Sequence, residues 1–266
     1  MKLPSRSLPS LLFLCLIVCA HPRHGFAQKA EKSAPGWGSE WTDAVTVDEL
    51  AAQKFVQAYT RLVERKKFPE AAQLCDAWIK DHPKQPKPYA MRALVKAQLK
   101  QLEAAEQDAT QSCDLATKGK SAAQGPILQL RSMIRTQRTN YAGAAQDLQG
   151  ALNENPNDAE MLNNLAWLRA TCPTDDVRNG REAVKLAQKA LTMNPNHRYA
   201  VVYTLAAAYA EAGDFPKAIQ TEKSALMEAQ QDRDKNSKTA RMMKEGLERM
   251  RLFEQGKPYH HALGQD

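Results

Sequence analysis

Two neighbouring segments of the sequence decide the fold: residues 162–191, LNNLAWLRATCPTDDVRNGREAVKLAQKAL, and residues 203–226, YTLAAAYAEAGDFPKAIQTEKSAL. In both segments alanine and large apolar residues recur three or four positions apart, the spacing that places side chains on one face of a helix. A proline or a glycine interrupts the pattern near the middle of each segment. Each segment therefore predicts two helices joined by a turn.

The same pattern recurs along the chain. An aromatic residue or leucine is followed three positions later by alanine in four copies, Phe68–Ala71, Leu102–Ala105, Tyr141–Ala144 and Phe215–Ala218, and Ala183 marks a divergent fifth copy. These five alanines, at positions 71, 105, 144, 183 and 218, are 34, 39, 39 and 35 residues apart. A small residue allows two antiparallel helices to approach closely at each of these positions. Pro83, Pro156 and Pro195 are expected to follow the ends of second helices.

A period near 34 residues with these landmarks resembles the tetratricopeptide repeat. The two segments quoted above resemble, in particular, a group of exported bacterial tetratricopeptide proteins with consecutive LAW-LxATxP-D-VRxGxxAVxLAxxA and DTLAAAYAEAGxFxxA units. The stretch Arg251–Tyr259, RLFEQGKPY, looks like the terminal LxLYxxGKPY of that group. Two features differ from it: the stretch Val202–Thr204, VYT, stands where the group often has an acidic residue before Thr-Leu, and the second repeat lacks the aromatic residue and the closing proline.

The repeats predict an all-α chain, a right-handed α-solenoid of about five helix–turn–helix units closed by a C-terminal capping helix. Composition agrees, because alanine supplies 41 of the 266 residues and glycine only 12. We expect a signal peptide at 1–27, a flexible leader at 28–46, the repeat array at 47–234, and a capping helix with a tail at 235–266. The approximate repeat boundaries are 52–85, 86–119, 125–158, 159–197 and 199–232. In the capping stretch, Met242, Met243, Leu247 and Met250 are expected to cover the last repeat.

The first 27 residues have the three regions of a secretory signal. Lys2 and Arg6 precede the apolar run Leu11–Ala20, and Gly25–Ala27 offers small residues for cleavage after Ala27. The apolar run is too short to span a bilayer, which takes roughly 20 residues. We therefore expect an exported protein, periplasmic or secreted, without a transmembrane segment after cleavage. Cleavage would lower the formal net charge from +7 to +4, which does not favour nucleic-acid binding.

Three cysteines remain after the signal: Cys75, Cys113 and Cys172. Their number is odd and their spacing irregular, so we expect small buried residues rather than a disulfide framework. A disulfide between Cys75 and Cys113 remains the alternative, because an exported protein meets an oxidising environment.

The sequence contains no motif of an enzyme or of a cofactor site. GxxxxGK[ST], GxGxxG, HExxH and GxSxG are all absent, which leaves phosphate-binding, dinucleotide-binding, zincin and hydrolase chemistry without support. The acidic pair Asp175–Asp176, in an insertion near 174–178, is expected to cap a short helical turn rather than to catalyse. We expect no catalytic residue, no cofactor and no metal.

The expected function is binding of a protein or peptide partner. A concave groove in the solenoid would hold an extended segment or a helix of another protein in the cell envelope, and an architectural, oligomer-forming platform is the alternative. The residues expected to line the groove combine amides with apolar side chains: Gln129, Met133, Asn163, Asn164, Trp167 and Tyr203. Packing of Trp167 and Tyr203 between neighbouring repeats is the competing interpretation. The sequence identifies neither the partner nor the oligomeric state.

Overall fold

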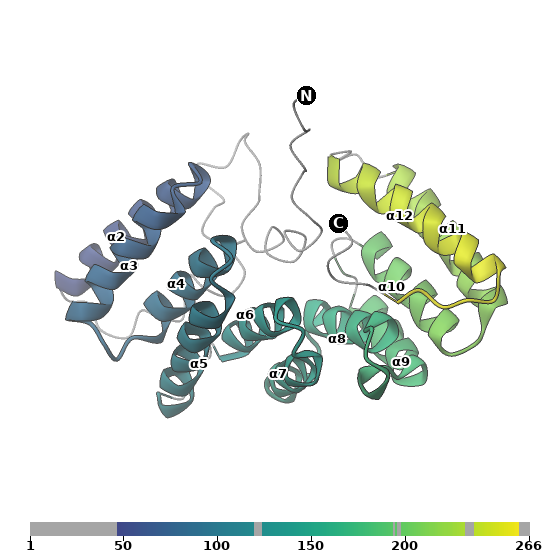
Figure 1. Cartoon of the computed structure of the whole chain (residues 1–266), viewed down its shortest axis with the longest axis horizontal. Helices are drawn as coiled ribbons and strands as arrows, with labels where there is room; N and C mark the ends of the chain where they lie inside the picture. Colours follow the sequence, from purple (N-terminus) through teal and green to yellow (C-terminus); the bar gives the residue numbers. More distant parts are fainter. Residues whose placement is uncertain (1–46, 120–123, 194, 196–197, 232–236, 261–266) are drawn as a thin grey trace, which may run out of the picture. The chain divides into compact units, whose positions relative to one another are not determined.

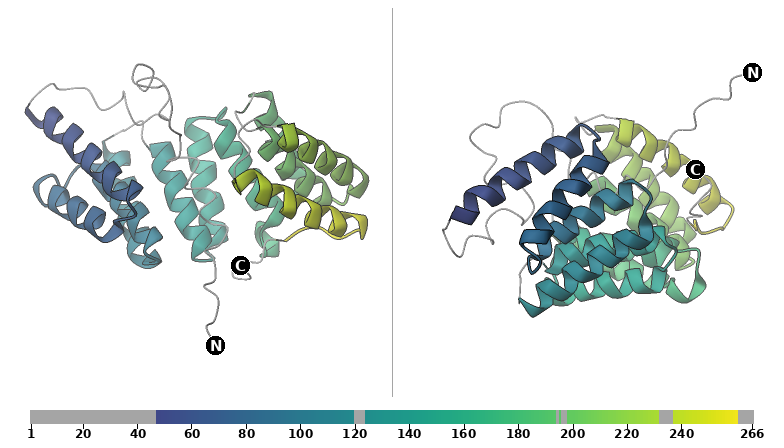
Figure 2. Two further views of the ribbon diagram at one scale, coloured as in Figure 1. Left: turned by 90° about the horizontal axis from the view of Figure 1, so that it is seen from above. Right: turned by 60° about the vertical axis from the view of Figure 1, so that its left-hand side comes forward.

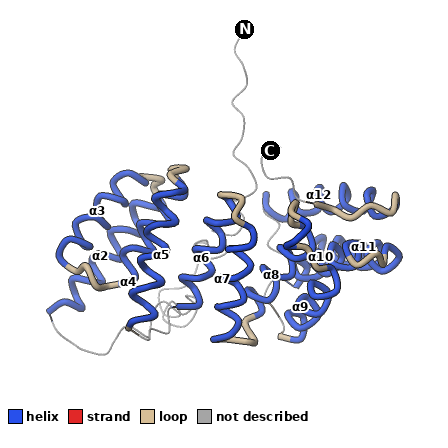
Figure 3. The backbone as a smooth tube through the Cα atoms, turned by 60° about the horizontal axis from the view of Figure 1, so that its bottom comes forward, coloured by secondary structure: helices blue, strands red, loops and turns tan. Residues whose placement is uncertain are grey.

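The computed structural model describes residues 47–119, 124–193, 195, 198–231 and 237–260, and within these residues it contains eleven α-helices and one short 3-10 turn (Figure 1). No strand occurs in the described part of the chain (Figure 3). The predicted all-α fold class is therefore confirmed. None of the helices in these ranges is both long enough and apolar enough to span a membrane. The expected signal peptide and leader lie outside the described residues.

The chain divides into two compact units between Thr139 and Asn140. Five helices form unit 1: α2 (Val47–Glu64), α3 (Phe68–Asp81), α4 (Pro86–Gln98), α5 (Leu102–Lys118) and α6 (Gln124–Gln137). Within this unit each helix packs against the next one along the chain, and Figure 2 shows these neighbours side by side.

Unit 2 contains the remaining elements: α7 (Tyr141–Glu154), α8 (Ala159–Thr171), η1 (Asp175–Val177), α9 (Gly180–Thr192), α10 (Arg198–Glu211), α11 (Phe215–Gln231) and α12 (Ser237–Glu254). Helix α10 is at the centre of this unit, because it contacts α8, α9, α11 and α12. Its sequence is accordingly apolar on nearly every side, with ten of its fourteen residues buried.

The alanines that mark the repeats lie where helices cross. All five are completely buried, at 0% exposure: Ala71, Ala105, Ala144, Ala183 and Ala218. In unit 2, Ala218 of α11 packs with Ala206 and Ala210 of α10 and with Phe253 of α12. The period read from these alanines therefore reports the close helix contacts of the array.

The turns that end several helices share one geometry. A residue with positive φ follows α2, α4, α6, α10 and α12 at Lys66, Lys100, Thr139, Gly213 and Gly256. At Lys100 the backbone N–H bonds the carbonyl of Ala97, and the next N–H, of Gln101, bonds the carbonyl of Lys96. Gly213 and Gly256, with the residues that follow them, repeat this pair of bonds. A left-handed residue thus closes each of these helices.

This geometry predicts opposite effects of two substitutions. Lys100 has φ of 63°, so Lys100→Gly should raise the free energy of unfolding by about 1 kcal/mol, because glycine avoids the left-handed strain. Gly213 has φ of 84°, and an added Cβ would meet only open space, so Gly213→Ala should lower stability by about the same amount through backbone strain alone. Urea denaturation of both variants tests the signs, and two changes of the same sign would contradict the interpretation.

Side chains fix the starts of several helices. Asn140, Asp158, Asn179 and Asp214 each accept a hydrogen bond from a backbone N–H in the first turn of the following helix. The insertion contains the expected helical turn, η1, but the expected capping by its acids is wrong. Asp175 and Asp176 lie within the turn, and Asp175 instead bonds Arg178. The guanidinium of Arg178 is close enough to attract that carboxylate away from the backbone.

All three cysteines of the described chain are buried and none of them forms a disulfide, as expected. Cys75 is 0% exposed within the cluster of Phe55, Tyr59 and Met91, and burial raises the pKa of its thiol to about 12. A thiol of this kind is an inert packing group, and the disulfide between Cys75 and Cys113 is not formed.

Helix α12 covers the last helix pair with a face that differs from the expected one. Its buried residues are Met242, Gly246, Arg249 and Phe253, whereas Leu247 is 48% exposed. The expectation that Leu247 packs inward is therefore wrong. The reason is that a glycine and an arginine occupy two buried positions of α12, so apolar spacing alone points to the wrong side of the helix.

Candidate functional site

The predicted groove residues fall in both units. In unit 1, Gln129 and Met133 lie on α6. Met133 is 6% exposed and packs with Ala93, Ala97 and Ala105, so it belongs to the core of that unit. Gln129 is half-buried.

In unit 2, Asn163, Asn164 and Trp167 lie on α8, and Tyr203 lies on α10. Trp167 is half-buried, and Tyr203 is only 2% exposed. The structure brings Trp167 and Tyr203 together around a third side chain, Arg249 of α12. Tyr203 thus packs between α10 and α12, and a role of these residues in binding a partner stays a prediction.

Arg249 is the central residue of this cluster, which we call the arginine cage. Its guanidinium carbon lies 4.9 Å from the centroid of the Tyr203 ring and 5.8 Å from those of Trp167 and Tyr259. Its Nη2 donates a 2.8 Å hydrogen bond to Glu222 Oε1 on α11, and its Nε donates to the same oxygen at 3.2 Å. The Arg249 and Glu222 side chains are 4% and 0% exposed. Stacking on three rings and an ion pair together hold the buried cation.

Glu222 has only part of its hydrogen-bonding capacity satisfied. Its Oε2 and the Tyr203 hydroxyl are buried without a hydrogen-bond partner among the described residues. A Cβ at Gly246 would lie 2.8 Å from Glu222 Oε1 and 3.0 Å from the Tyr203 ring, so glycine is what lets α12 approach this closely. Burial raises the pKa of the Glu222 carboxyl to about 7, although the Arg249 guanidinium acts in the opposite direction.

This shift predicts a pH dependence of stability. The pKa of Glu222 is higher in the folded chain, about 7, than its ordinary value of 4.5, so the folded state binds a proton more tightly. Its contribution to stability is fully present below pH 4.5 and is lost as pH rises through 7. Arg249, Tyr203 and Tyr259 are the other ionisable groups of the cage. Urea denaturation at several pH values should show this decline in wild type and a weaker decline in Glu222→Gln; identical profiles would contradict it.

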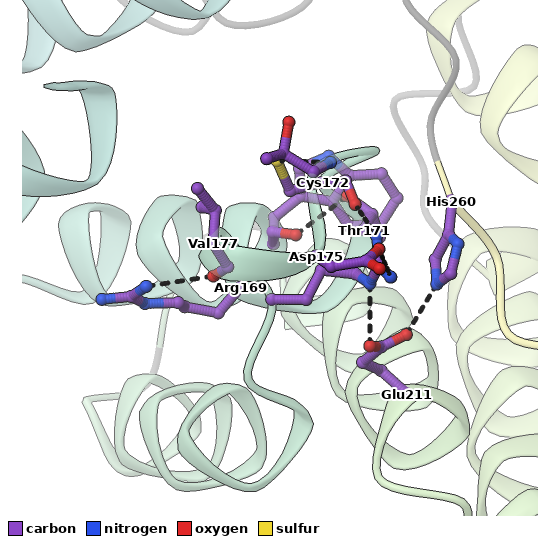
Figure 4. Close-up of polar contacts among 10 residues, drawn as sticks. Arg169, Thr171, Cys172, Asp175, Val177, Glu211 and His260 are labelled. Carbon is purple, nitrogen blue, oxygen red and sulfur yellow. Dashed lines mark hydrogen bonds and ion pairs between the residues drawn. The ribbon is translucent and has the colours of Figure 1, made fainter. Parts of the chain in front are cut away.

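The residues after α12 form a second part of the site. Lys257–His260 has no helical structure, and the Tyr259 ring centroid lies 6.2 Å from that of Trp167. His260 Nε2 lies 2.8 Å from Glu211 Oε2 at the end of α10 (Figure 4). The C-terminal segment therefore lies against α8 and α10, the helices that carry most of the predicted groove residues. Sequence reasoning missed Arg249, Glu222 and Glu211, because charged residues on helices read as solvent-exposed.

Two amides on α8 also have unsatisfied atoms. Asn163 Oδ1 and Asn164 Nδ2 are shielded from solvent and have no hydrogen-bond partner within the described part of the chain. A buried amide atom without a partner costs free energy, so both side chains are strained in hydrogen-bonding terms where they lie. Both residues lie close to Trp167 in sequence, so α8 carries two amides and an indole ring within neighbouring turns.

Unit 1 contains a separate depression beside the turn between α4 and α5. It is about 670 Å³ in volume, is shallow, and contains none of the predicted groove residues. Its lining is mostly polar: Lys100, Gln101, Leu102, Glu103, Ala104, Gln107 and Arg138. Across the described residues, no three His, Cys, Asp or Glu side chains gather in a way that could hold a metal ion.

Comparison with known proteins agrees with this architecture. Residues 178–240 match the family model described as a tetratricopeptide repeat. The fold resembles that of MamA from Desulfovibrio magneticus RS-1, at 16% identity and a TM-score of 0.57 over 69% of this chain and 97% of that one. It also resembles YrrB, described as a TPR protein with an unusual peptide-binding site, at 14% identity and a TM-score of 0.54 over 76% of this chain and 100% of that one.

A third similar fold belongs to the APC/C hetero-tetramer Cut9–Hcn1, at 15% identity and a TM-score of 0.54 over 74% of this chain and 36% of that one. No curated protein matches the sequence. The family match covers residues 178–240, and these similar folds define the architecture: the described part of the chain is an all-helical repeat fold that resembles tetratricopeptide solenoids. Repeats of this type generally serve as protein interaction modules.

Proposed function

We propose that the chain is a non-enzymatic module of the cell envelope that binds an extended segment or a helix of another protein on α8 and α10. The observation that carries this proposal is the combination on α8 of unsatisfied amides, Asn163 and Asn164, with the half-buried ring of Trp167. Amides can pair with a peptide backbone, and an indole ring supplies apolar contact. YrrB, whose description names a peptide-binding site, offers a precedent for this use of the fold.

Export is part of the proposal and has its own test. Residues 1–27 have the pattern of a signal peptide, so protein recovered from the cell envelope should begin at Gln28 when its N-terminus is sequenced. Recovery of a form that begins at Met1 from the cytoplasm would overturn the envelope location while leaving the binding proposal intact.

Partner binding is tested with residues 28–266 as bait in an envelope extract, followed by mass spectrometry and a quantitative binding assay with the captured protein. Asn163→Ala should weaken binding by about 1 kcal/mol without lowering the melting temperature, because its amide oxygen has no partner to lose among the described residues. Asn153→Ala, an exposed amide on α7, is the matched control and should bind as wild type. Equal affinity of both variants would place Asn163 outside the site.

The alternative, an oligomeric platform, is distinguished by light scattering after size-exclusion chromatography. A monomer at all concentrations supports the binding module. A closed oligomer that captures no partner would favour the platform.

A further inference from the structure

The C-terminal segment Lys257–His260 occupies the face of unit 2 on which the proposed partner would bind. The turn at Gly256, with φ of 67°, ends α12 and directs the chain back towards α10. Tyr259 is partly buried against the cluster that contains Ala206, Ala210 and Phe253, and its ring also contacts Trp167 of α8. The small side chains on α10 leave room for this ring, so an extended segment of the chain itself fills the site.

The surface beneath the segment is held in place by contacts that do not involve the segment. Arg178 Nε donates to Glu211 Oε1 at 2.9 Å, which leaves Glu211 Oε2 directed at His260 (Figure 4). Arg178 is itself fixed by Asp175 and by the Cys172 carbonyl, at 2.7 Å from its Nη1. The Glu211 side chain is 15% exposed. The Glu211 carboxylate is therefore positioned by contacts that lie outside the segment.

The segment is held by contacts of Tyr259 and His260. The His260 side chain is 36% exposed, and an exposed polar contact of this kind with Glu211 contributes about 0–1 kcal/mol. The ring contact of Tyr259 with Trp167 contributes about 0.5–1.5 kcal/mol beyond the area that it buries, and Tyr259 also packs against the cluster of Ala206, Ala210 and Phe253 and lies under Arg249. Covalent attachment adds a high effective concentration to these contacts. A partner with the same two groups and additional contacts could displace it.

We propose that the surface formed by Trp167, Glu211 and the α10 alanines Ala206 and Ala210 binds an extended partner segment. In this partner segment an aromatic side chain is followed by a cationic one. The chain's own Tyr259 and His260 occupy this surface and keep it closed until such a segment displaces them. This inference rests on the proposed function, since it names the partner chemistry of the same helices.

The test uses residues 28–266 and a synthetic peptide with the sequence of residues 255–262, Gln-Gly-Lys-Pro-Tyr-His-His-Ala. Two-dimensional NMR follows the indole N–H resonance of Trp167, assigned with Trp167→Phe, during titration with the peptide. The double variant Tyr259→Ser/His260→Ser, which we call the opened variant, should bind the peptide at least ten-fold more tightly than wild type, because its own segment no longer competes. Lys257→Ser changes an exposed residue of the same segment and should behave as wild type.

Two further measurements identify the recognised groups. A peptide with serine in place of its tyrosine should not shift the Trp167 resonance, and adding Glu211→Gln to the opened variant should weaken binding of the unchanged peptide. If the double variant melts early, His260→Ser alone provides the test, because this exposed position can be changed without disturbing the core. Equal binding to wild type and to the opened variant, or no binding to a well-folded opened variant, would overturn the inference.

The outcomes also separate this inference from the proposed function. A captured partner that binds wild type and the opened variant equally would leave the interaction module intact but remove the occluding role of Tyr259 and His260. Peptide binding to the opened variant without any captured partner would support the occluding role of Tyr259 and His260 and leave the interaction module without support.

Discussion

Replacing Arg249 with methionine is expected to lower the free energy of unfolding by about 3 kcal/mol at pH 8. The substitution leaves Glu222, which is 0% exposed, without the cation that neutralises it, and a buried ion pair that loses one member typically costs about 3–5 kcal/mol. It also removes the guanidinium from the rings of Trp167, Tyr203 and Tyr259. Methionine fills a similar volume, so the loss reports charge and stacking more than an empty space.

The cost of Arg249→Met should depend on pH and on Glu222. Because burial has already raised the pKa of Glu222 to about 7, the carboxyl is largely protonated at pH 5, and the substitution should cost much less there. The double variant Arg249→Met/Glu222→Gln should recover most of the loss at pH 8, because it buries no charge. Arg251→Met, on the exposed side of the same helix, is the control. Urea denaturation at both pH values measures all four proteins, and an equal loss at pH 5 and pH 8 would contradict the argument.

Gly180→Ala is expected to lower the free energy of unfolding by about 3 kcal/mol through steric overlap. Gly180 is the first residue of α9, and an added Cβ would lie 2.4 Å from the backbone nitrogen of Ala212 and 2.6 Å from the carbonyl carbon of Glu211. Both atoms belong to backbone, which cannot turn aside as a flexible side chain can. Overpacking of this kind costs about 1–3 kcal/mol, and rigid neighbours place the expected loss at the upper end.

The neighbouring residue provides the control for Gly180→Ala. Arg181 is exposed on the same turn of α9, so Arg181→Ala should leave stability nearly unchanged. Thermal melts followed by circular dichroism compare the two variants. A Gly180→Ala variant with the same melting temperature as Arg181→Ala would contradict the prediction, because it would show that α9 can move away from the end of α10.

The repeat fold could be predicted from the sequence because its strongest signal is local. The alanines at 71, 105, 144, 183 and 218 recur at nearly constant spacing, and each is completely buried. Some turn residues have backbone needs that the sequence shows directly: Gly213, with positive φ, follows α10, and Asp214 caps the start of α11. Lys66 and Lys100 adopt the same left-handed turn without glycine, so the sequence gives no sign of it there.

The arginine cage could not be predicted, because it depends on contacts between helices distant in sequence. Arg249 and Glu222 are 27 residues apart, and each looks like an ordinary surface charge in its own helix. Gly246 alone would suggest a weak helix, but at this position a Cβ would meet Glu222 of α11 and Tyr203 of α10, so glycine allows the close approach of α12. The placement of Tyr259 on Trp167 likewise follows from the return of the chain after Gly256 rather than from any periodic pattern.

The buried ion pair between α11 and α12 also bears on how unit 2 opens. In arrays whose repeats contact only their neighbours, the terminal helices usually fray first, since they are supported on one side. Here the last helix is fastened through Arg249 to α11 and through Phe253 to α10. Amide hydrogens of α10 and α11 should therefore exchange with solvent more slowly than those of α7, so that opening of this unit proceeds from its N-terminal helix towards the C-terminal end.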